Sequence, residues 1–290
     1  MASVAKRLET NAPGDFFVDA TCIDCETCRW VAPASFDGAR GLSRVFHQPA
    51  NDQERKRAEM ALLACPVAAI GAVEKHDLAE ARHAFPEQLA DGVYHCGYHA
   101  PESYGAASYL IVRPAGNVLV DSPRFAGPLV QRIEALGGIS FMFLTHRDDV
   151  ADHAKFVAHF GCKRIIHAED AGWGLRDIET KITGNAPFAL DDGLTVIPVP
   201  GHTHGSACLH YADRFLFSGD HISWDPDDHR IGAWREVCWY DWDALVRSNA
   251  RLLGYRFEWL LPGHGYRCHF PAMRMAQEMR RCQRSLESGA

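Results

Sequence analysis

Short apolar runs separated by turn-forming residues dominate this chain from about residue 90 onward, which is typical of buried strands. Residues 114–116 read Pro-Ala-Gly, a turn that predicts a hairpin between two of these runs. The predicted strands cover residues 92–95, 108–112, 117–121, 139–145, 164–167, 194–200, 214–217 and 259–262.

Helical periodicity is found between several of these runs, at 129–136, 152–160 and 242–253. An earlier helix is predicted over 51–63, where Asn51 or Asp52 supplies the cap and acidic residues come early. This helix ends just before Cys65, which is followed by a proline that suits a helix stop.

Four potential metal ligands stand where predicted strands end. They are His146, His202, Asp220 and His264. Because strand ends lie side by side in a sheet, we expect these side chains to converge at one rim. Imidazoles and carboxylates together suit zinc, iron or manganese.

Composition narrows the class of protein. The chain has 290 residues, of which 47% are hydrophobic, enough for two domains with separate cores. The formal net charge of −7 and the absence of a basic cluster argue against nucleic-acid binding. The N-terminus has no apolar core of signal-peptide length, and no apolar run could span a bilayer. We therefore expect a cytoplasmic protein with no membrane partner, in which the ten cysteines form no disulfides.

Three evenly spaced cysteines indicate a second candidate metal site. Cys22, Cys25 and Cys28 are followed much later by Cys65. A cubane iron–sulfur cluster needs four thiolates, and closely spaced cysteines can reach three corners while a distant one closes the fourth. A structural zinc site is the alternative, but zinc cysteines typically come as two paired C-x2-C units. The pattern therefore favours iron–sulfur.

Residues 14–72 resemble a ferredoxin half. Ala32 occupies the position where a two-cluster ferredoxin carries a further cysteine, although the proline after it is kept. The resemblance therefore implies a single [4Fe-4S] cluster on Cys22, Cys25, Cys28 and Cys65, within a domain of residues 1–78.

Residues from about 90 to the end resemble the metallo-β-lactamase fold superfamily. The resemblance is carried by Thr145-His146 with Asp152-His153, by residues 201–206 (Gly-His-Thr-His-Gly-Ser), by residues 217–220 (Phe-Ser-Gly-Asp) and by residues 261–265 (Leu-Pro-Gly-His-Gly). It implies an αββα sandwich over residues 79–290 and hence an α+β chain. It also implies one or two divalent ions, zinc or iron, with Asp220 as the bridging carboxylate.

The first histidine segment departs from the family pattern, because residues 146–153 are two longer than the usual spacing. We expect a short insertion, with His146 and Asp148 on one metal and Asp152 and His153 on the other. Asp149 is the alternative to Asp148. The predicted metal ligands are therefore His146, Asp148, Asp152, His153, His202, Asp220 and His264.

Two enzymatic functions compete at this stage. The first is a hydrolase in which a metal-bound hydroxide attacks an ester, thioester, lactone or amide of a small-molecule substrate, with Asp152 as the catalytic carboxylate. The cluster would then be structural or redox-sensing. The alternative is an iron-dependent oxidoreductase whose ferredoxin region supplies electrons from an external donor. A non-enzymatic iron–sulfur sensor is a third reading, which the intact His202, Asp220 and His264 disfavour.

Overall fold

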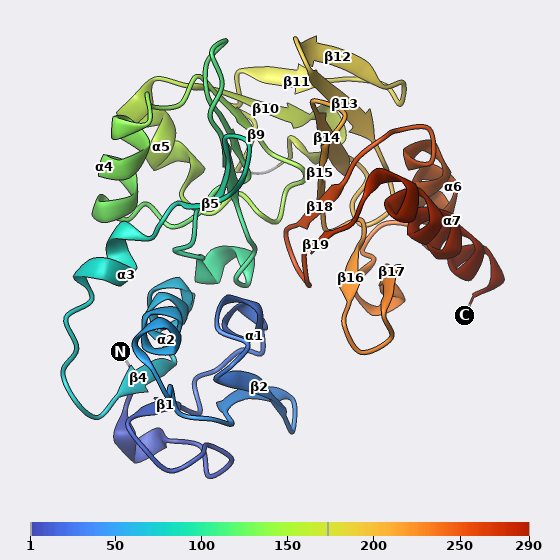
Figure 1. Ribbon diagram of the computed structural model, residues 1–290. Helices are drawn as coiled ribbons and strands as arrows, with labels where there is room; N and C mark the ends of the chain where they lie inside the picture. Colours follow the sequence, from blue (N-terminus) through green and yellow to red (C-terminus); the bar gives the residue numbers. More distant parts are fainter. Residues whose placement is uncertain (1, 173, 290) are drawn as a thin grey trace.

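Figure 1 shows the computed structural model, which describes residues 2–172 and 174–289. Two β-sheets lie in the middle of the larger part of the molecule. Helices α4 (Gly127–Ala135) and α5 (His153–Phe160) cover one side, and α6 (Trp242–Leu252) and α7 (Ala272–Ser288) cover the other (Figure 1). This is the αββα layering that the sequence predicts, and the N-terminal part of the chain, through β4 (Ile70–Ala72), forms a smaller region at one end.

The first sheet has seven strands in the order β11-β10-β9-β8-β7-β6-β5. Strands β8 to β11 run parallel, whereas β5 to β8 are antiparallel to one another, and β7 pairs with β8 as the predicted hairpin. Its strands are β5 (Glu87–Ala90), β6 (Val93–His95), β7 (Tyr109–Ile111), β8 (Val118–Val120), β9 (Phe141–Phe143), β10 (Lys163–His167) and β11 (Thr180–Ile182).

The second sheet has six strands in the order β12-β13-β14-β15-β18-β19. Strands β15 and β18 are parallel, and the other neighbours are antiparallel. Its strands are β12 (Phe188–Asp191), β13 (Leu194–Pro198), β14 (Ala207–Tyr211), β15 (Phe215–Gly219), β18 (Trp259–Pro262) and β19 (Cys268–His269), and a separate hairpin is formed by β16 (Ser223–Asp225) and β17 (Arg230–Gly232).

Apolar side chains fill three layers. One core lies between the sheets and includes Ile111, Phe143 and Phe217, all fully buried. A second core lies under α6 and α7. The third joins the N-terminal region to the outer face of the first sheet, because residues such as Val18 and Ala61 belong to the same cluster as Leu129 and Phe156. The domain boundary at residue 78 stays a prediction, and this apolar core runs across it.

The N-terminal region is built around helix α2 (Asp52–Ala64). Asn51 caps it by accepting a hydrogen bond from the Glu54 amide at 2.9 Å, as the sequence predicts. This region also contains α1 (Thr27–Val31), the pair β1 (Phe16–Val18) and β4 (Ile70–Ala72), and the hairpin β2 (Phe36–Ala39) with β3 (Leu42–Val45). Helix α3 (Ala79–His83) follows it along the chain. Among the described residues, no helix is long and apolar enough to cross a membrane.

Candidate functional site

The four strand-end residues converge between the two sheets. His146 follows β9 of the first sheet, whereas His202, Asp220 and His264 follow β13, β15 and β18 of the second. Asp220 Oδ2 lies 3.6 Å from Nε2 of His146 and 3.7 Å from Nε2 of His202. The same oxygen is 2.8 Å from Nδ1 of His264. Strand ends from both sheets therefore meet at one point, with Asp220 at its centre.

Both alternatives for the irregular first segment lie at this point. Asp148 Oδ2 is 3.6 Å from Nε2 of His202, and Asp149 Oδ1 is 4.0 Å from Nε2 of His146. Ligand atoms lie within 4.8 Å of one another in two groups, His146 with Asp148 and His202, and His146 with Asp149 and Asp220. Two ligands about 2.1 Å from a tetrahedral ion are about 3.4 Å apart, so these separations suit shared metal coordination.

Unpaired buried atoms show that the site fits a cation. Nε2 of His146, His202 and His264 and both carboxylate oxygens of Asp149 are buried without a hydrogen-bond partner among the described residues. Buried polar groups are normally hydrogen-bonded, so these unpaired atoms need an explanation. One or two metal ions would satisfy those of His146, His202 and Asp149, which belong to the converging groups.

The charges of the site are strongly coupled. Burial alone would raise the pKa of Asp220, but the His264 imidazole holds it far below its ordinary range. Burial would lower the pKa of His264, yet Asp220 and Asp149 raise it to about 10. Burial lowers the pKa of His146 to about 4, which keeps this imidazole neutral, as a metal ligand must be. Burial and the nearby Asp220 carboxylate raise the pKa of Asp149 well above its ordinary value.

Two buried aspartates that the sequence analysis did not single out support the ligands. Asp121, directly after β8, accepts hydrogen bonds from the amide and hydroxyl of Thr145, and that hydroxyl lies 3.0 Å from Nδ1 of His146. Asp170 accepts from the amides of Arg147 and Gly205, at 3.0 and 2.8 Å. Asp121 ends a predicted strand, so the strand-end rule could have found it. Asp170 gave no such signal.

Asp152 and His153 are placed differently from the expectation. The Asp152 carboxylate accepts from the Phe125 amide at 2.8 Å and pairs with Lys155 at 2.7 Å. His153 begins α5, and its Nδ1 is 3.1 Å from the Arg164 guanidinium. Among the described residues, Asp152, His153 and His264 all lie outside the two groups of converging ligand atoms, but His264 is hydrogen-bonded to Asp220 of the second group. The partners of the two side chains are Phe125 and Lys155 for Asp152 and Arg164 for His153, whereas Asp149 lies close to Asp220.

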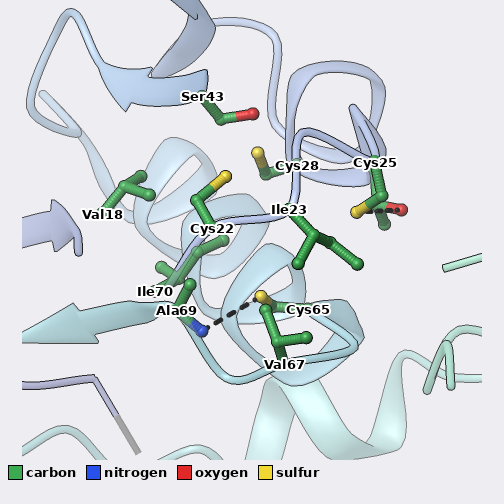
Figure 2. A pocket seen from close by; sticks show the side chains of 11 residues that line it. Val18, Cys22, Ile23, Cys25, Cys28, Ser43, Cys65, Val67, Ala69 and Ile70 are labelled. Carbon is green, nitrogen blue, oxygen red and sulfur yellow. Dashed lines mark hydrogen bonds between the residues drawn. The ribbon is translucent and has the colours of Figure 1, made fainter. Parts of the chain in front are cut away.

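The four clustered cysteines line one pocket in the N-terminal region, which Figure 2 shows from close by. Cys22 and Cys25 lie in the loop before α1, Cys28 lies within α1, and Cys65 directly follows α2. Apolar side chains such as Val18 complete the wall. Backbone amides point at two of the sulfurs, from Ala69 to Cys65 at 3.2 Å and from Asp24 to Cys22 at 3.4 Å.

The spacing of these thiols suits a cluster better than a single ion. Zn–S bonds are about 2.3 Å, so the sulfurs of a tetrahedral zinc site would lie about 3.8 Å apart. In the part of the chain that the structure describes, no three cysteine sulfurs come within 4.8 Å of one another. Burial raises the pKa of Cys25 to about 11 and also raises the pKa of Cys65. Thiolates therefore need a bound positive group in this pocket.

An open cavity of about 410 Å³ is lined by Asp148 of the converging groups, and by Arg147 and Glu169 among others. A loop with four exposed large apolar side chains is hydrogen-bonded to the backbone of His202. The Trp239 amide donates to the His202 carbonyl at 2.9 Å. These four side chains, called here the aromatic lip, are Trp234, Val237, Trp239 and Tyr240.

Comparison with known proteins gives independent information on each part of the chain. Residues 18–72 match the family model described as the 4Fe-4S single cluster domain of Ferredoxin I. The acyl-coenzyme A thioesterase MBLAC2 of Bos taurus is 32% identical over 129 residues, covering 39% of this chain and 43% of the relative. The hydroxyacylglutathione hydrolase of Anaeromyxobacter dehalogenans strain 2CP-C is 32% identical over 128 residues, covering 42% of this chain and 48% of the relative. The chain thus spans less than half the length of these curated relatives.

Among solved structures, the DIM-1 metallo-beta-lactamase superposes with a TM-score of 0.54 at 16% identity, covering 70% of this chain and 97% of that chain. A likeness at this identity concerns the fold, and it agrees with the two sheets and their outer helices described above. The larger part of this chain therefore has the metallo-beta-lactamase fold, and it follows an N-terminal region similar to a single-cluster ferredoxin domain.

Proposed function

We propose that this protein is a metal-dependent hydrolase that cleaves ester-type bonds, with thioesters as the favoured class. The proposal is carried by the convergence of His146, His202, Asp149 and Asp220, several of whose buried ligand atoms are unpaired. His264 adjoins this group through its hydrogen bond with Asp220. When bound, the metal ions supply a Lewis acid and lower the pKa of water so that it can attack a carbonyl. The names of the curated relatives, a thioesterase and a hydroxyacylglutathione hydrolase, support the thioester class.

The chain's own residues would divide the remaining tasks. Asp148 is half-exposed at the cavity mouth, with Oδ2 toward His202 and Oδ1 3.7 Å from Nε of Arg147. The nearby His202 imidazole lowers the pKa of Asp148, so this carboxylate stays ionised and can orient the attacking water by accepting a hydrogen bond from it. Arg147 lines the open cavity and would bind an anionic group of the substrate. Asp152, the catalytic carboxylate expected from the sequence, has both oxygens engaged elsewhere.

The aromatic lip would hold an apolar acyl group. Its Trp239 ring lies 6.2 Å from the ring of His202, so an acyl chain resting on the lip would place its carbonyl beside the metal ligands. Tyr240 stacks on His204 at 4.4 Å, which fixes the far side of this surface. Exposed aromatic groups beside a polar centre are a common way to bind apolar substrate parts.

A thiol-release assay tests the proposal. Protein purified anaerobically with its metals is given acetyl and octanoyl thioesters of N-acetylcysteamine, and the free thiol is measured. We expect hydrolysis in the wild type and in Asp152→Asn, and none in Asp220→Ala. Unchanged turnover in Asp220→Ala would remove the centre from the reaction, and no turnover with any thioester or ester at full metal content would refute the hydrolase.

A second function, an iron-dependent oxidoreductase, is favoured by one observation. Three carboxylates, Asp148, Asp149 and Asp220, stand among the converging groups, and an oxygen-rich site suits iron. Elemental analysis separates the two functions. Iron at the level of one cluster together with zinc supports the hydrolase, whereas iron well beyond one cluster without zinc supports the oxidoreductase. The cytoplasmic location and an external electron donor stay predictions.

A further inference from the structure

The segment 99–109, which leads into β7, contacts the cysteine pocket directly. Gly105 sits against Cys25, because a Cβ built at Gly105 would lie 2.8 Å from Cys25 Cβ and 3.0 Å from its Sγ. The φ angle of +88° also requires a backbone conformation that glycine adopts freely. The Tyr104 hydroxyl donates to the carbonyl of Ile23, inside the cysteine loop.

The same segment contacts the loop that carries a metal ligand. The Ala107 amide donates to the carbonyl of Gly263 at 2.7 Å, one residue before His264. The Tyr104 ring lies 6.3 Å from the imidazole of His264, between centroids. Tyr104 therefore touches the cysteine loop with its hydroxyl while its ring lies beside the metal centre.

Polar contacts fix this segment from both sides. The buried His99 ring donates from Nδ1 to the Gly105 carbonyl at 2.6 Å. The buried Tyr109 hydroxyl donates to the Pro262 carbonyl at 2.8 Å. A displacement on the cysteine side therefore has a short, hydrogen-bonded route to the His264 loop.

We propose that the segment 104–109 couples the two sites, so that the iron–sulfur cluster positions His264 and its loss weakens metal binding at the catalytic centre. This inference rests on the proposed metal centre and cluster. Tyr104 and Gly105 are positioning residues in it. Without a cluster to hold Cys25 and its loop, Gly105 loses its packing surface and Tyr104 its acceptor. The protein would then hydrolyse its substrate efficiently only while its cluster is intact.

The test measures zinc affinity in two cluster states. Protein with its cluster, freed of the second metal, is titrated with Zn²⁺ against a fluorescent chelator, and the titration is repeated after oxidative loss of the cluster. Couplings between sites are typically about 5- to 150-fold in affinity, so we expect the Kd for Zn²⁺ to rise by a factor in that range. By linkage, bound Zn²⁺ must raise the equilibrium affinity of the protein for its cluster by the same factor. We therefore also expect slower bleaching of the visible absorbance of the cluster when Zn²⁺ is bound.

Two variants separate coupling from simple destabilisation. Tyr104→Phe removes the hydroxyl that reaches Ile23, and the ratio of the two Kd values should fall several-fold toward one. Tyr255→Phe, which removes a hydroxyl from a ring packed against His210, should leave the ratio unchanged. A merely structural role for Tyr104 would lower thermal stability and shift both Kd values together, leaving their ratio as in the wild type.

Each result points to one conclusion. A wild-type ratio within twofold of one, with circular dichroism showing a folded cluster-free protein, overturns the coupling. An unchanged ratio in Tyr104→Phe overturns the assigned route. If His264→Ala binds Zn²⁺ as tightly as the wild type, the proposed metal centre itself is wrong, which is a separate failure.

Discussion

Asp149 is a buried carboxylate whose two oxygens have no hydrogen-bond partner among the described residues, close to Asp220. Replacing it by asparagine keeps the shape and removes the charge. An uncompensated buried charge costs about 3–5 kcal/mol, whereas an unsatisfied neutral acceptor costs about 1–3 kcal/mol. The metal-free Asp149→Asn protein should therefore gain about 2 kcal/mol in its free energy of unfolding. At about 2–4 °C per kcal/mol, Tm should rise by about 4–8 °C.

The effect of Asp149→Asn on the free energy of unfolding should depend on pH. The pKa of Asp149 is raised on folding, so between the unfolded value of about 3.9 and the folded value the native protein binds more protons. The wild-type free energy of unfolding therefore falls as pH rises through that interval. Asp149→Asn removes this slope, and the difference in Tm between the two metal-free proteins should widen from pH 4 upward.

Zinc should reverse the order of stability. A ligand present at 100 times its Kd stabilises the native state by about 2.7 kcal/mol, and the variant lacks one coordinating group. Thermal unfolding is followed by circular dichroism with and without Zn²⁺, on protein that keeps its cluster. Asp152→Asn is the matched control, because it removes a carboxylate held by Phe125 and should lower Tm slightly while keeping the zinc effect. A lower Tm for metal-free Asp149→Asn, or an undiminished zinc effect, would refute the reasoning.

Three further changes test other parts of the molecule. Cys65→Ser should abolish the visible absorbance of the cluster, and a spectrum like that of the wild type would exclude this thiol as a ligand. Gly263→Ala should lower zinc affinity at least tenfold, because the added Cβ would lie 2.4 Å from Asp149 Oδ2 and 2.7 Å from Asp220 Oδ1. Normal zinc titration in that variant would contradict the ligand positions. Trp239→Ala should raise KM for the octanoyl thioester several-fold more than for the acetyl thioester, and equal effects would show that the aromatic lip does not hold the acyl group.

Much of the fold could be predicted because the runs that form it are regular. Strands such as 194–200 and 259–262 are predicted by apolar runs that glycine and proline bound. Helix α7 (Ala272–Ser288) was not predicted, although it buries residues such as Met275 and Met279. Its buried positions are few and its exposed ones strongly charged, so its apolar face was easily overlooked.

The sequence predicts the convergence of candidate ligands from strand geometry only where the residue follows a strand. His202 and Asp220 follow that rule, so their convergence is a consequence of sheet geometry. Asp152 did not behave as its sequence position suggested, because local hydrogen bonds to Phe125 and Lys155 decide where its side chain points. Support from Asp170 depends on a tertiary contact with residues 203–205, which no local pattern encodes.

The apolar core shared by Val18, Ala61, Leu129 and Phe156 has a consequence for how the chain can be divided. A ferredoxin carried on a free linker could be cut away and still work as a mobile electron shuttle. Here, separating the two parts would expose apolar surface on both fragments and leave each prone to aggregate. We therefore expect the cysteine-bearing region to depend on its contact with the larger part of the chain for stability.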